Sequence, residues 1–428
     1  MIGTGYVGLV SGACFSDLGN TVYCVDKDID KINMLNLGDI PIYEPGLNEI
    51  VKKNYLSNRL QFTNDLSKAV KLSDIVFICV GTPTSKKDKS ADLQFVFKVA
   101  REISRNINKF KIIVTKSTIP VGTGDKIEKI ISRKKSKKMF EVVSNPEFLR
   151  EGEAIRDFRF PDRIVVGSNS KKITKKLESL YEPLVKKGAI FFSTTRRGAE
   201  MIKYASNAFL ATKISYINEI ANLCEKTGVN VENVSIGMGL DKRIGSRFLR
   251  AGPAFGGSCF PKDTKAITVI GDLYKTDLSI VKSVIKSNTK RKKILTERVK
   301  GILSNKLKNK KIAILGVTIK PNTDDMRQSS RLLMIPFLQK EGAKIKYYDP
   351  SGKKKEFLKF KNVLFCENVR EACKDVDLII IHTEWDEFKS IDFKKISKNK
   401  KLKIYDMRNL YSPEKMKNSG LSYYSIGR

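Results

Sequence analysis

Short apolar runs alternate with helical stretches through the first third of the chain. The runs are rich in Val and Ile and are bounded by turn residues, which is typical of buried strands. Strands separated by helices indicate a parallel sheet with right-handed crossovers. The expected strands cover Thr21–Asp26, Asp74–Gly81, Lys111–Thr118, Glu141–Ser144 and Arg163–Gly167.

A long helical pattern follows from Gly198 to Lys226, and Gly228 suits the position just past a helix end. More helical sequence continues to about Gly301. The strand–helix alternation then returns, with elements expected at Lys311–Gly316, Ser330–Glu341, Lys344–Tyr348, Asp377–His382 and Lys403–Asp406.

This pattern predicts an α/β protein with two Rossmann-like parallel-sheet domains, joined by a central helical region that contains one long helix. A chain of 428 residues is too long for one hydrophobic core. We expect a dinucleotide-binding domain at 1–195, a central helical region at 196–300 and a second Rossmann-like domain at 301–428.

The formal net charge of +35 is unusual. The basic runs are short, since Ser136 interrupts Lys134–Lys138 and Glu356 follows Lys353–Lys355. Neither run lies in a recognisable nucleic-acid module. We therefore interpret the excess charge as solvated and expect no nucleic-acid partner, although a positive field favours a diphosphate-bearing substrate.

The seven cysteines are odd in number and include no CxxC pair, so neither a disulfide framework nor a zinc site is indicated. A reducing compartment, the cytoplasm, fits this best. No apolar stretch reaches the roughly 20 residues of a membrane span, so no membrane partner is expected. The single histidine, His382, excludes a His-based metal cluster, and we interpret it as structural.

The chain begins with a G-x-G-x-x-G pattern at Gly3, Gly5 and Gly8. Such glycines allow a tight turn, backbone approach to a pyrophosphate and close helix packing. Asp26 ends the next predicted strand, where a carboxylate binds a ribose diol and favours NAD over NADP. Because only Met1 and Ile2 precede Gly3, the first strand is expected to be nearly absent, through either a truncated start or a shortened strand.

The segment Phe255–Asp263 contains a cysteine, Cys259, after two glycines, which let a ligand or another backbone come close. Pro261 suits the first helix position, which would place Cys259 just ahead of a helix N-terminus. Helix-end amides and Lys262 would then stabilise a thiolate, with Asp263 one turn further on. The alternative is a buried cysteine in a glycine turn.

Two further polar features accompany this segment. Lys203 and Asn207 stand at i and i+4, so they lie on one face of the long helix. They are either a polar pair inserted in the core or part of a solvated face. Glu147 follows a predicted strand, where loops at a sheet edge carry ligands.

Seven ordered blocks of the sequence resemble the UDP-glucose/GDP-mannose dehydrogenase family over nearly its whole length. They are Gly3–Gly8, Val80–Thr84, Lys116–Thr123, Ser144–Leu149, Lys203–Asn207, Phe255–Asp263 and Asp324–Ser330. The resemblance implies a four-electron oxidation of a sugar primary alcohol to a carboxylate, with two NAD per turnover.

The resemblance also implies catalytic roles. Cys259 would form a thiohemiacetal and then a thioester, and Lys203 with Asn207 would stabilise the oxyanion. Asp263 and Glu147 would handle protons and orient the hydrolytic water, which Thr118 helps to hold. Which carboxylate serves as base at each step stays open.

The resemblance also implies a set of binding residues and a homodimer, but it implies no metal site. Arg243 matches an arginine that reaches across a dimer interface to the neighbour's substrate. The expected NAD contacts are Gly3, Gly5, Gly8, Asp26, Lys31, Thr82, Thr118, Glu151 and Arg327. The expected contacts to the UDP-sugar are Phe148, Leu149, Arg150, Glu151, Lys203, Asn207, Arg243, Phe255, Gly256, Lys320 and Arg408.

The C-terminal domain lacks a second G-x-G-x-x-G at Ile312–Gly316, so it should not bind a dinucleotide. In the family this domain holds the nucleotide half of the substrate. Pro321 and Asn322 depart from the commoner pattern and could alter how the loop presents Lys320.

Several alternatives remain at this stage. The Tyr43–Gly46 loop and Asn145–Leu149 resemble the UDP-glucose branch, but UDP-N-acetylmannosamine and GDP-mannose are alternative substrates. A two-electron hydroxyacid-type dehydrogenase shares the glycine-rich entrance and the long helix but uses no cysteine. A non-catalytic basic binding protein is a third class.

Overall fold

The computed structural model describes residues 1–85, 87–88, 90–396, 399 and 401–428. The chain forms two compact units. The N-terminal unit comprises Met1–Ser206 and Lys265–Asp277, and the C-terminal unit comprises Asn207–Thr264 and Leu278–Arg428. Two of the three unit boundaries fall inside helices, α9 (Arg196–Thr227) and α11 (Phe260–Leu273), and the third lies between Asp277 and Leu278.

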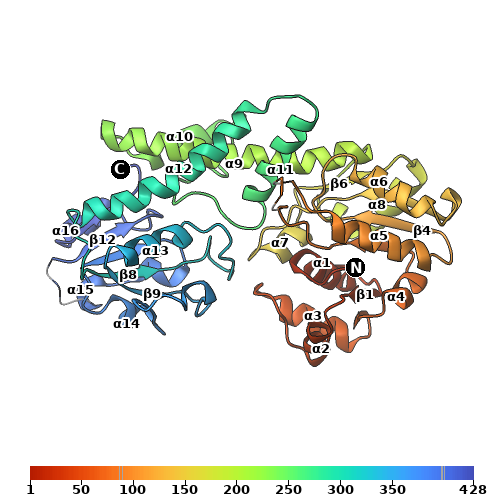
Figure 1. Ribbon diagram of the computed structural model, residues 1–428, viewed down its shortest axis with the longest axis horizontal. Coiled ribbons are helices and arrows are strands. Elements are labelled where there is room, and N and C mark those ends of the chain that lie inside the picture. Colours follow the sequence, from red (N-terminus) through yellow and green to blue (C-terminus); the bar gives the residue numbers. More distant parts are fainter. Residues whose placement is uncertain (86, 89, 397–398, 400) are drawn as a thin grey trace. The chain divides into compact units, whose positions relative to one another are not determined.

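The strands of the N-terminal unit form a mainly parallel sheet in the order β2-β1, then β3-β4-β5-β6-β7. Figure 1 labels β1, β4 and β6 among them. The strands are β1 (Val22–Val25), β2 (Leu60–Thr63), β3 (Ile75–Ile78), β4 (Lys111–Thr115), β5 (Phe140–Ser144), β6 (Arg163–Gly167) and β7 (Ile190–Thr194). β5 and β6 are the exception, because they pair antiparallel through Ser144 and Gly167.

A single residue, Ile2, joins the two parts of this sheet. It forms parallel bridges to Val25 of β1 and Ile78 of β3. Its N–H donates to the Phe77 carbonyl (2.8 Å), and the N–H of Gly3 donates to the Val25 carbonyl (2.7 Å). The expectation of a nearly absent first strand is confirmed, and the resulting order has the doubly wound arrangement of a dinucleotide-binding fold.

Helices cover both faces of this sheet, since alternate residues of a strand point to opposite sides. Ile112 and Val114 of β4 pack with α1, α3, α7 and α8, whereas Ile113 packs with α4, α5 and α6. The helices are α1 (Tyr6–Asp17), α2 (Ile29–Leu37), α3 (Leu47–Leu56), α4 (Leu66–Leu72), α5 (Gln94–Asn106), α6 (Thr123–Ser132), α7 (Ala154–Arg159) and α8 (Lys171–Val185).

The C-terminal unit contains a six-stranded parallel sheet in the order β10-β9-β8-β11-β12-β13. Ile312 and Ile314 of β8 pack with α12 and α13, and Ala313 and Leu315 pack with α14 to α16 on the other face. The strands are β8 (Lys311–Leu315), β9 (Lys344–Tyr348), β10 (Val363–Phe365), β11 (Leu378–Ile381), β12 (Lys403–Asp406) and β13 (Ser422–Tyr424). The helices are α10 (Val231–Leu240), α12 (Ser279–Ile302), α13 (Arg331–Lys340), α14 (Val369–Cys373), α15 (Phe393–Ile396) and α16 (Pro413–Asn418).

The predicted fold class is confirmed. The long helix predicted from Gly198 to Lys226 is α9, which starts two residues earlier, and Gly228 after it has a φ of 72°. Strands β2, β7, β10 and β13 were not anticipated, because each is short or lies at a sheet edge. Along the described chain, no helix combines the length and the apolar character needed to cross a membrane.

Candidate active site

The glycine-rich turn leaves the N-terminus of α1 open to a ligand. Gly3 has a φ of +99°, and a Cβ there would lie 2.9 Å from the Cys79 carbonyl oxygen. A Cβ on Gly8 would lie 1.8 Å from the Gly3 carbonyl oxygen. Gly5 is the N-cap of α1, and a Cβ there would meet nothing within 4 Å. The first and third glycines are therefore required by packing, and the middle one exposes helix N–H groups that attract an anion.

Asp26 follows β1 and binds this turn directly. Its Oδ2 accepts from the N–H (2.9 Å) and the hydroxyl (2.8 Å) of Thr4 and lies 3.4 Å from the Lys31 ammonium. Burial alone would raise the pKa of Asp26, but the two bonds from Thr4, one from the Asp28 N–H and the charge of Lys31 outweigh it, so the pKa is lowered. An ionised carboxylate here fits a dinucleotide with a free ribose diol.

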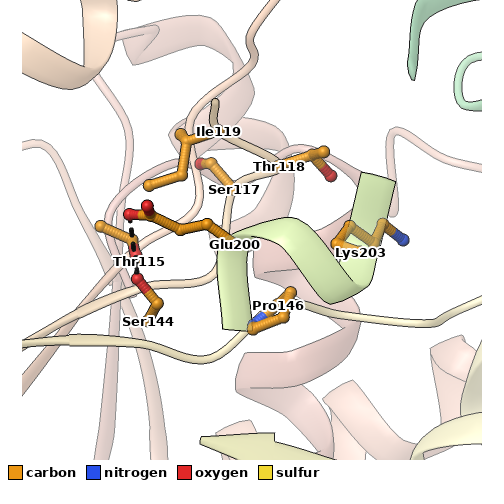
Figure 2. Close-up of a pocket in the computed structure, with 8 residues that line it drawn as sticks. All are labelled: Thr115, Ser117, Thr118, Ile119, Ser144, Pro146, Glu200 and Lys203. Atoms are coloured by element: carbon orange, nitrogen blue, oxygen red, sulfur yellow. Dashed lines mark hydrogen bonds between the residues drawn. The ribbon is translucent and has the colours of Figure 1, made fainter. Parts of the chain in front are cut away.

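Thr118 lies in the loop after β4, on the same sheet edge. Its carbonyl accepts a hydrogen bond from the Thr82 hydroxyl (2.9 Å), which joins two expected cofactor contacts. Thr118 also lines a cavity of about 10 Å³, which has room for about one water molecule. Figure 2 shows the lining residues, which are Thr115, Ser117, Thr118, Ile119, Ser144, Pro146, Glu200 and Lys203.

Lys203 is held next to Glu147. Its ammonium donates to the Glu147 carbonyl (2.6 Å) and lies 3.1 Å from the side-chain Oε1. The other carboxylate oxygen of Glu147 accepts from the Leu149 N–H at 2.6 Å. The Lys203 side chain is 4% exposed and that of Glu147 is 5% exposed. A fixed cation in such a dry environment can stabilise a developing oxyanion.

Asn207, one turn further along α9, contacts Asp263 in the C-terminal unit. Its amide donates to Asp263 Oδ2 at 2.6 Å, and the Lys262 ammonium donates to Oδ1 at 2.5 Å. Asp263 is fully buried. Because Lys203 and Asn207 are also buried, they do not form the solvated face that the sequence left open.

Cys259 immediately precedes α11, as predicted. The helix begins at Phe260, so the expectation that Pro261 takes the first position is wrong by one residue. The Cys259 carbonyl accepts a hydrogen bond from the Asp263 N–H at 2.8 Å. The Cys259 sulfur lies 3.4 Å from the Ser258 hydroxyl oxygen. Lys262, which was expected to stabilise a thiolate, forms an ion pair with the Asp263 carboxylate.

The two glycines before the cysteine bring it against another backbone segment. Gly257 donates to the Arg327 carbonyl at 2.7 Å. A Cβ on Gly256 would lie 2.8 Å from the Gln328 carbonyl oxygen. Gly257 has a φ of +87°, and a Cβ there would lie 2.7 Å from the side chain of Ile319. The predicted close approach is therefore made by the loop from Ile319 to Gln328.

The loop after Glu147 contains the expected substrate contacts of the N-terminal unit. The Phe148 ring contacts two cations, with the guanidinium carbon of Arg163 4.1 Å and the ammonium of Lys203 5.1 Å from its centre. Arg150 pairs with Asp157 at 2.6 Å, and this hydrogen-bonded pair raises the pKa of its guanidinium.

Arg408 braces the Lys320 loop in the C-terminal unit. Its guanidinium donates to the His382 (2.8 Å) and Ile319 (3.0 Å) carbonyls and pairs with Glu384 (2.9 Å). Burial is the main cause of its lowered pKa. Burial also lowers the pKa of His382, so this ring is neutral, as expected of a structural histidine.

Arg243 and Arg327 lie at more exposed positions. Arg243 pairs with Asp241, and its side chain is 90% exposed. Arg327 pairs with Asp325 at 2.7 Å, and its side chain is 62% exposed.

The structure thus brings Thr118, Glu147 and Lys203 together in one unit, and Asn207, Cys259 and Asp263 in the other. Among the buried charged residues of the N-terminal unit that sequence reasoning did not single out are Lys116 and Glu200. The signal for Glu200 was present, since it is an acidic residue one turn before Lys203 in a largely apolar helix. Lys116 stood inside the predicted strand Lys111–Thr118 and directly follows β4 as observed.

Three sequence profiles of one family match the chain in order. The NAD binding domain of the UDP-glucose/GDP-mannose dehydrogenase family matches residues 1–185, its central domain matches 197–290, and its UDP binding domain matches 313–413.

Characterised relatives match over the full length. The UDP-glucose 6-dehydrogenase of Rhizobium meliloti (strain 1021) is 47% identical, covering 100% of this chain and 99% of the relative. The UDP-glucose 6-dehydrogenase TuaD of Bacillus subtilis (strain 168) is 46% identical, covering 100% and 92%.

Solved structures share the fold. A UDP-glucose dehydrogenase from the archaeon Pyrobaculum islandicum has a TM-score of 0.90 and 35% identity, covering 99% of this chain and 96% of its own. A UDP-D-ManNAc dehydrogenase from Pyrococcus horikoshii has a TM-score of 0.86 and 26% identity, covering 100% and 98%.

Proposed function

Because the chain belongs to the UDP-glucose/GDP-mannose dehydrogenase family, we propose that it oxidises UDP-glucose to UDP-glucuronate through intermediates bound covalently to Cys259. As a member of this family it is an NAD-dependent oxidoreductase. The proposal rests above all on one observation, a cysteine at the start of α11 next to the buried Asp263–Asn207 pair.

NAD, when bound, accepts the hydrides of both oxidations. The glycine turn would hold its pyrophosphate at the N-terminus of α1, and Asp26 would bind the ribose diol. The other residues proposed to contact NAD are Lys31, Thr82, Thr118, Glu151 and Arg327.

Cys259 performs the covalent chemistry in this proposal. Loss of a hydride and a proton turns the primary alcohol into an aldehyde, and the thiolate adds to its carbonyl carbon to give a thiohemiacetal. Loss of a second hydride from the carbon and of the proton from the hydroxyl of the thiohemiacetal leaves a thioester. Water then adds, the carbon–sulfur bond breaks, and the uronic acid leaves while the thiolate is restored.

Lys203 and Asn207 stabilise the oxyanion that forms at each stage. Lys203 suits this role because it is buried and fixed by the Glu147 carbonyl, so little reorganisation is needed as charge develops. Glu147 and Asp263 transfer protons and orient the hydrolytic water, with Thr118 helping to hold it.

The substrate residues divide between the two units. The loop Phe148–Glu151, together with Phe255 and Gly256, would contact the sugar side, and Lys320 and Arg408 the nucleotide. Arg408 already fixes the carbonyl next to Lys320, so one buried guanidinium would organise the loop that receives the diphosphate. In this scheme residues 1–195 bind NAD, 196–300 mediate dimerisation and 301–428 bind the UDP moiety.

We propose that the enzyme is a homodimer formed through the central helices. Phe209, Tyr216 and Leu223 repeat every seven residues along α9 and are 65%, 50% and 57% exposed. This spacing puts them on one apolar stripe, and α10 adds Ile236 and Leu240, also exposed. A second copy would bury these side chains. We also propose the reducing cytoplasm as the location, which the odd number of cysteines supports.

A panel of nucleotide sugars tests the substrate. UDP-glucose, UDP-N-acetylmannosamine and GDP-mannose are each supplied with NAD, and NADH and uronate are counted. We expect UDP-glucose to have the highest kcat/KM and to give two NADH per molecule consumed. One NADH per molecule would indicate the two-electron class, and preference for another sugar would reassign the substrate.

A further inference from the structure

Glu200 of α9 is a buried carboxylate that the proposed chemistry does not use. It is 3% exposed. Its oxygens accept hydrogen bonds from the N–H groups of Gly122 (2.6 Å) and Gly124 (2.8 Å) and from the Ser144 hydroxyl (3.2 Å). Burial is the main influence on Glu200 and raises its pKa, against these bonds. Burying a carboxylate costs free energy unless hydrogen bonds to it offset that cost. The three hydrogen bonds to Glu200 serve this purpose.

The partners of Glu200 show what it holds together. Gly122 is the N-cap of α6 and Gly124 lies in its first turn, so the carboxylate satisfies N–H groups at the positive end of that helix. Ser144 ends β5. A Cβ on Gly124 would lie 2.9 Å from Glu200 Oε1, so the glycine is what allows this approach.

The loop anchored in this way carries Thr118. It runs from the end of β4 to the N-cap Gly122, so Glu200 fixes it four residues beyond Thr118. On the helix side, Lys203 stands three residues after Glu200, one turn away. Figure 2 shows Thr118, Glu200 and Lys203 around the same small cavity, with the Glu200 carboxylate directed at Ser144.

A second contact ties the same two helices at another point. Arg196 of α9 pairs with Asp125 and Glu128 of α6, each at 2.6 Å. It does not line the cavity with Thr118 and Lys203. Arg196 therefore provides a comparison in which the helix contact is weakened without a direct effect on the Thr118 loop.

We infer that Glu200 is a positioning residue, whose carboxylate holds the Thr118 loop against the turn of α9 that carries Lys203 and so places the hydrolytic water. This inference rests on the proposed function, in which Thr118 acts at thioester hydrolysis. Disturbing Glu200 slows hydrolysis selectively, while formation of the thioester continues.

Glu200→Gln tests this directly, because the amide keeps the shape but turns one acceptor into a donor facing N–H groups. We expect kcat for UDP-glucose to fall about 10- to 100-fold. Intact mass spectrometry of acid-quenched turnover should detect a sugar-nucleotide adduct on Cys259. Gly124→Ala, whose Cβ would lie 2.9 Å from both this carboxylate and the Arg196 side chain, should give a weaker version of both effects. It serves if Glu200→Gln does not fold, with Arg196→Gln separating the contribution of Arg196.

Three controls interpret the result. Arg196→Gln should lower the thermal midpoint at least as much as Glu200→Gln but keep kcat within about threefold and accumulate no adduct. Thr118→Ala should accumulate the adduct. If the adduct accumulates in Thr118→Ala but in neither Glu200→Gln nor Gly124→Ala, the inference about Glu200 is wrong and the proposed function still stands. The same holds if Arg196→Gln loses as much kcat as Glu200→Gln. Failure of the wild-type enzyme to make two NADH overturns the proposed function.

Discussion

At the scale of single residues, Lys116 of the N-terminal unit shows how burial shifts the pKa of a charged group. The ammonium of Lys116 is enclosed and contacts Asn145 Oδ1 (3.1 Å) and the Tyr181 hydroxyl (3.3 Å). Burial lowers the pKa of Lys116 from 10.5 to about 8, although the charges of Cys79 and Glu147 oppose the shift. Lys116 is therefore partly neutral near neutral pH.

This predicts a pH dependence of stability. Between pH 8 and 10.5 the unfolded chain keeps a proton on Lys116 that the folded chain has lost, so the free energy of unfolding rises with pH. Lys116→Met removes this rise. The difference between wild type and variant should move in favour of wild type by up to about 1.4 kcal/mol per pH unit in this window.

Denaturant unfolding at pH 7.5, 8.5 and 9.5 measures the effect, and Lys172→Met, at an exposed position of α8, is the matched control. If the difference in free energy of unfolding between wild type and Lys116→Met stays constant with pH, the Lys116 ammonium is not shielded from water.

At the scale of elements, the glycine segment before α11 fixes where the cysteine lies. Gly257→Ala adds a Cβ 2.7 Å from Ile319 at a φ of +87°, so we expect a loss of about 1–3 kcal/mol in the free energy of unfolding. Because Cys259 is two residues away, kcat should fall as well.

The control for this change is Gly301→Ala near the end of α12, where a Cβ meets nothing within 4 Å. It should be neutral or stabilise by up to about 1 kcal/mol. Equal stability of the two variants would mean that the cysteine segment is not pressed against the Ile319 loop.

The elements themselves were largely predictable from sequence. Strands buried on both faces, such as β4 and β8, read as continuous apolar runs, and α9 ends at Thr227, just before the expected Gly228. Edge strand β7 was missed because Ile190 and Phe192 are exposed there, so burial gives its sequence no distinctive pattern.

The site was predictable in part. Residue spacing placed Cys259 before a helix and Lys203 one turn from Asn207. It could not show that Lys262 would pair with Asp263, nor that Glu200 would cap α6, because both depend on which side chains the fold brings together.

At the scale of the whole molecule, the proposed dimer makes a prediction about Arg243. In a mixed dimer, one protomer carries Arg243→Ala and the other carries Cys259→Ala. If Arg243 acts on the neighbour's substrate, one of the two sites of this dimer keeps both Cys259 and Arg243. Half of the dimers in an equal mixture are mixed, so about a quarter of wild-type activity should return.

Mixing the two inactive variants under exchange conditions and measuring NADH production checks this. Recovery of no activity, with exchange verified by mass, would place Arg243 in its own protomer's site. A monomer in sedimentation would remove the basis for the prediction.

The central claim is that Cys259 bonds to the substrate between two oxidations, and single turnover of Cys259→Ser tests it most directly. Wild type should release two NADH and one free uronate per UDP-glucose. The variant should stop short of two NADH or keep the sugar nucleotide attached to the protein. Two NADH and free uronate from the variant at the wild-type rate would contradict the account.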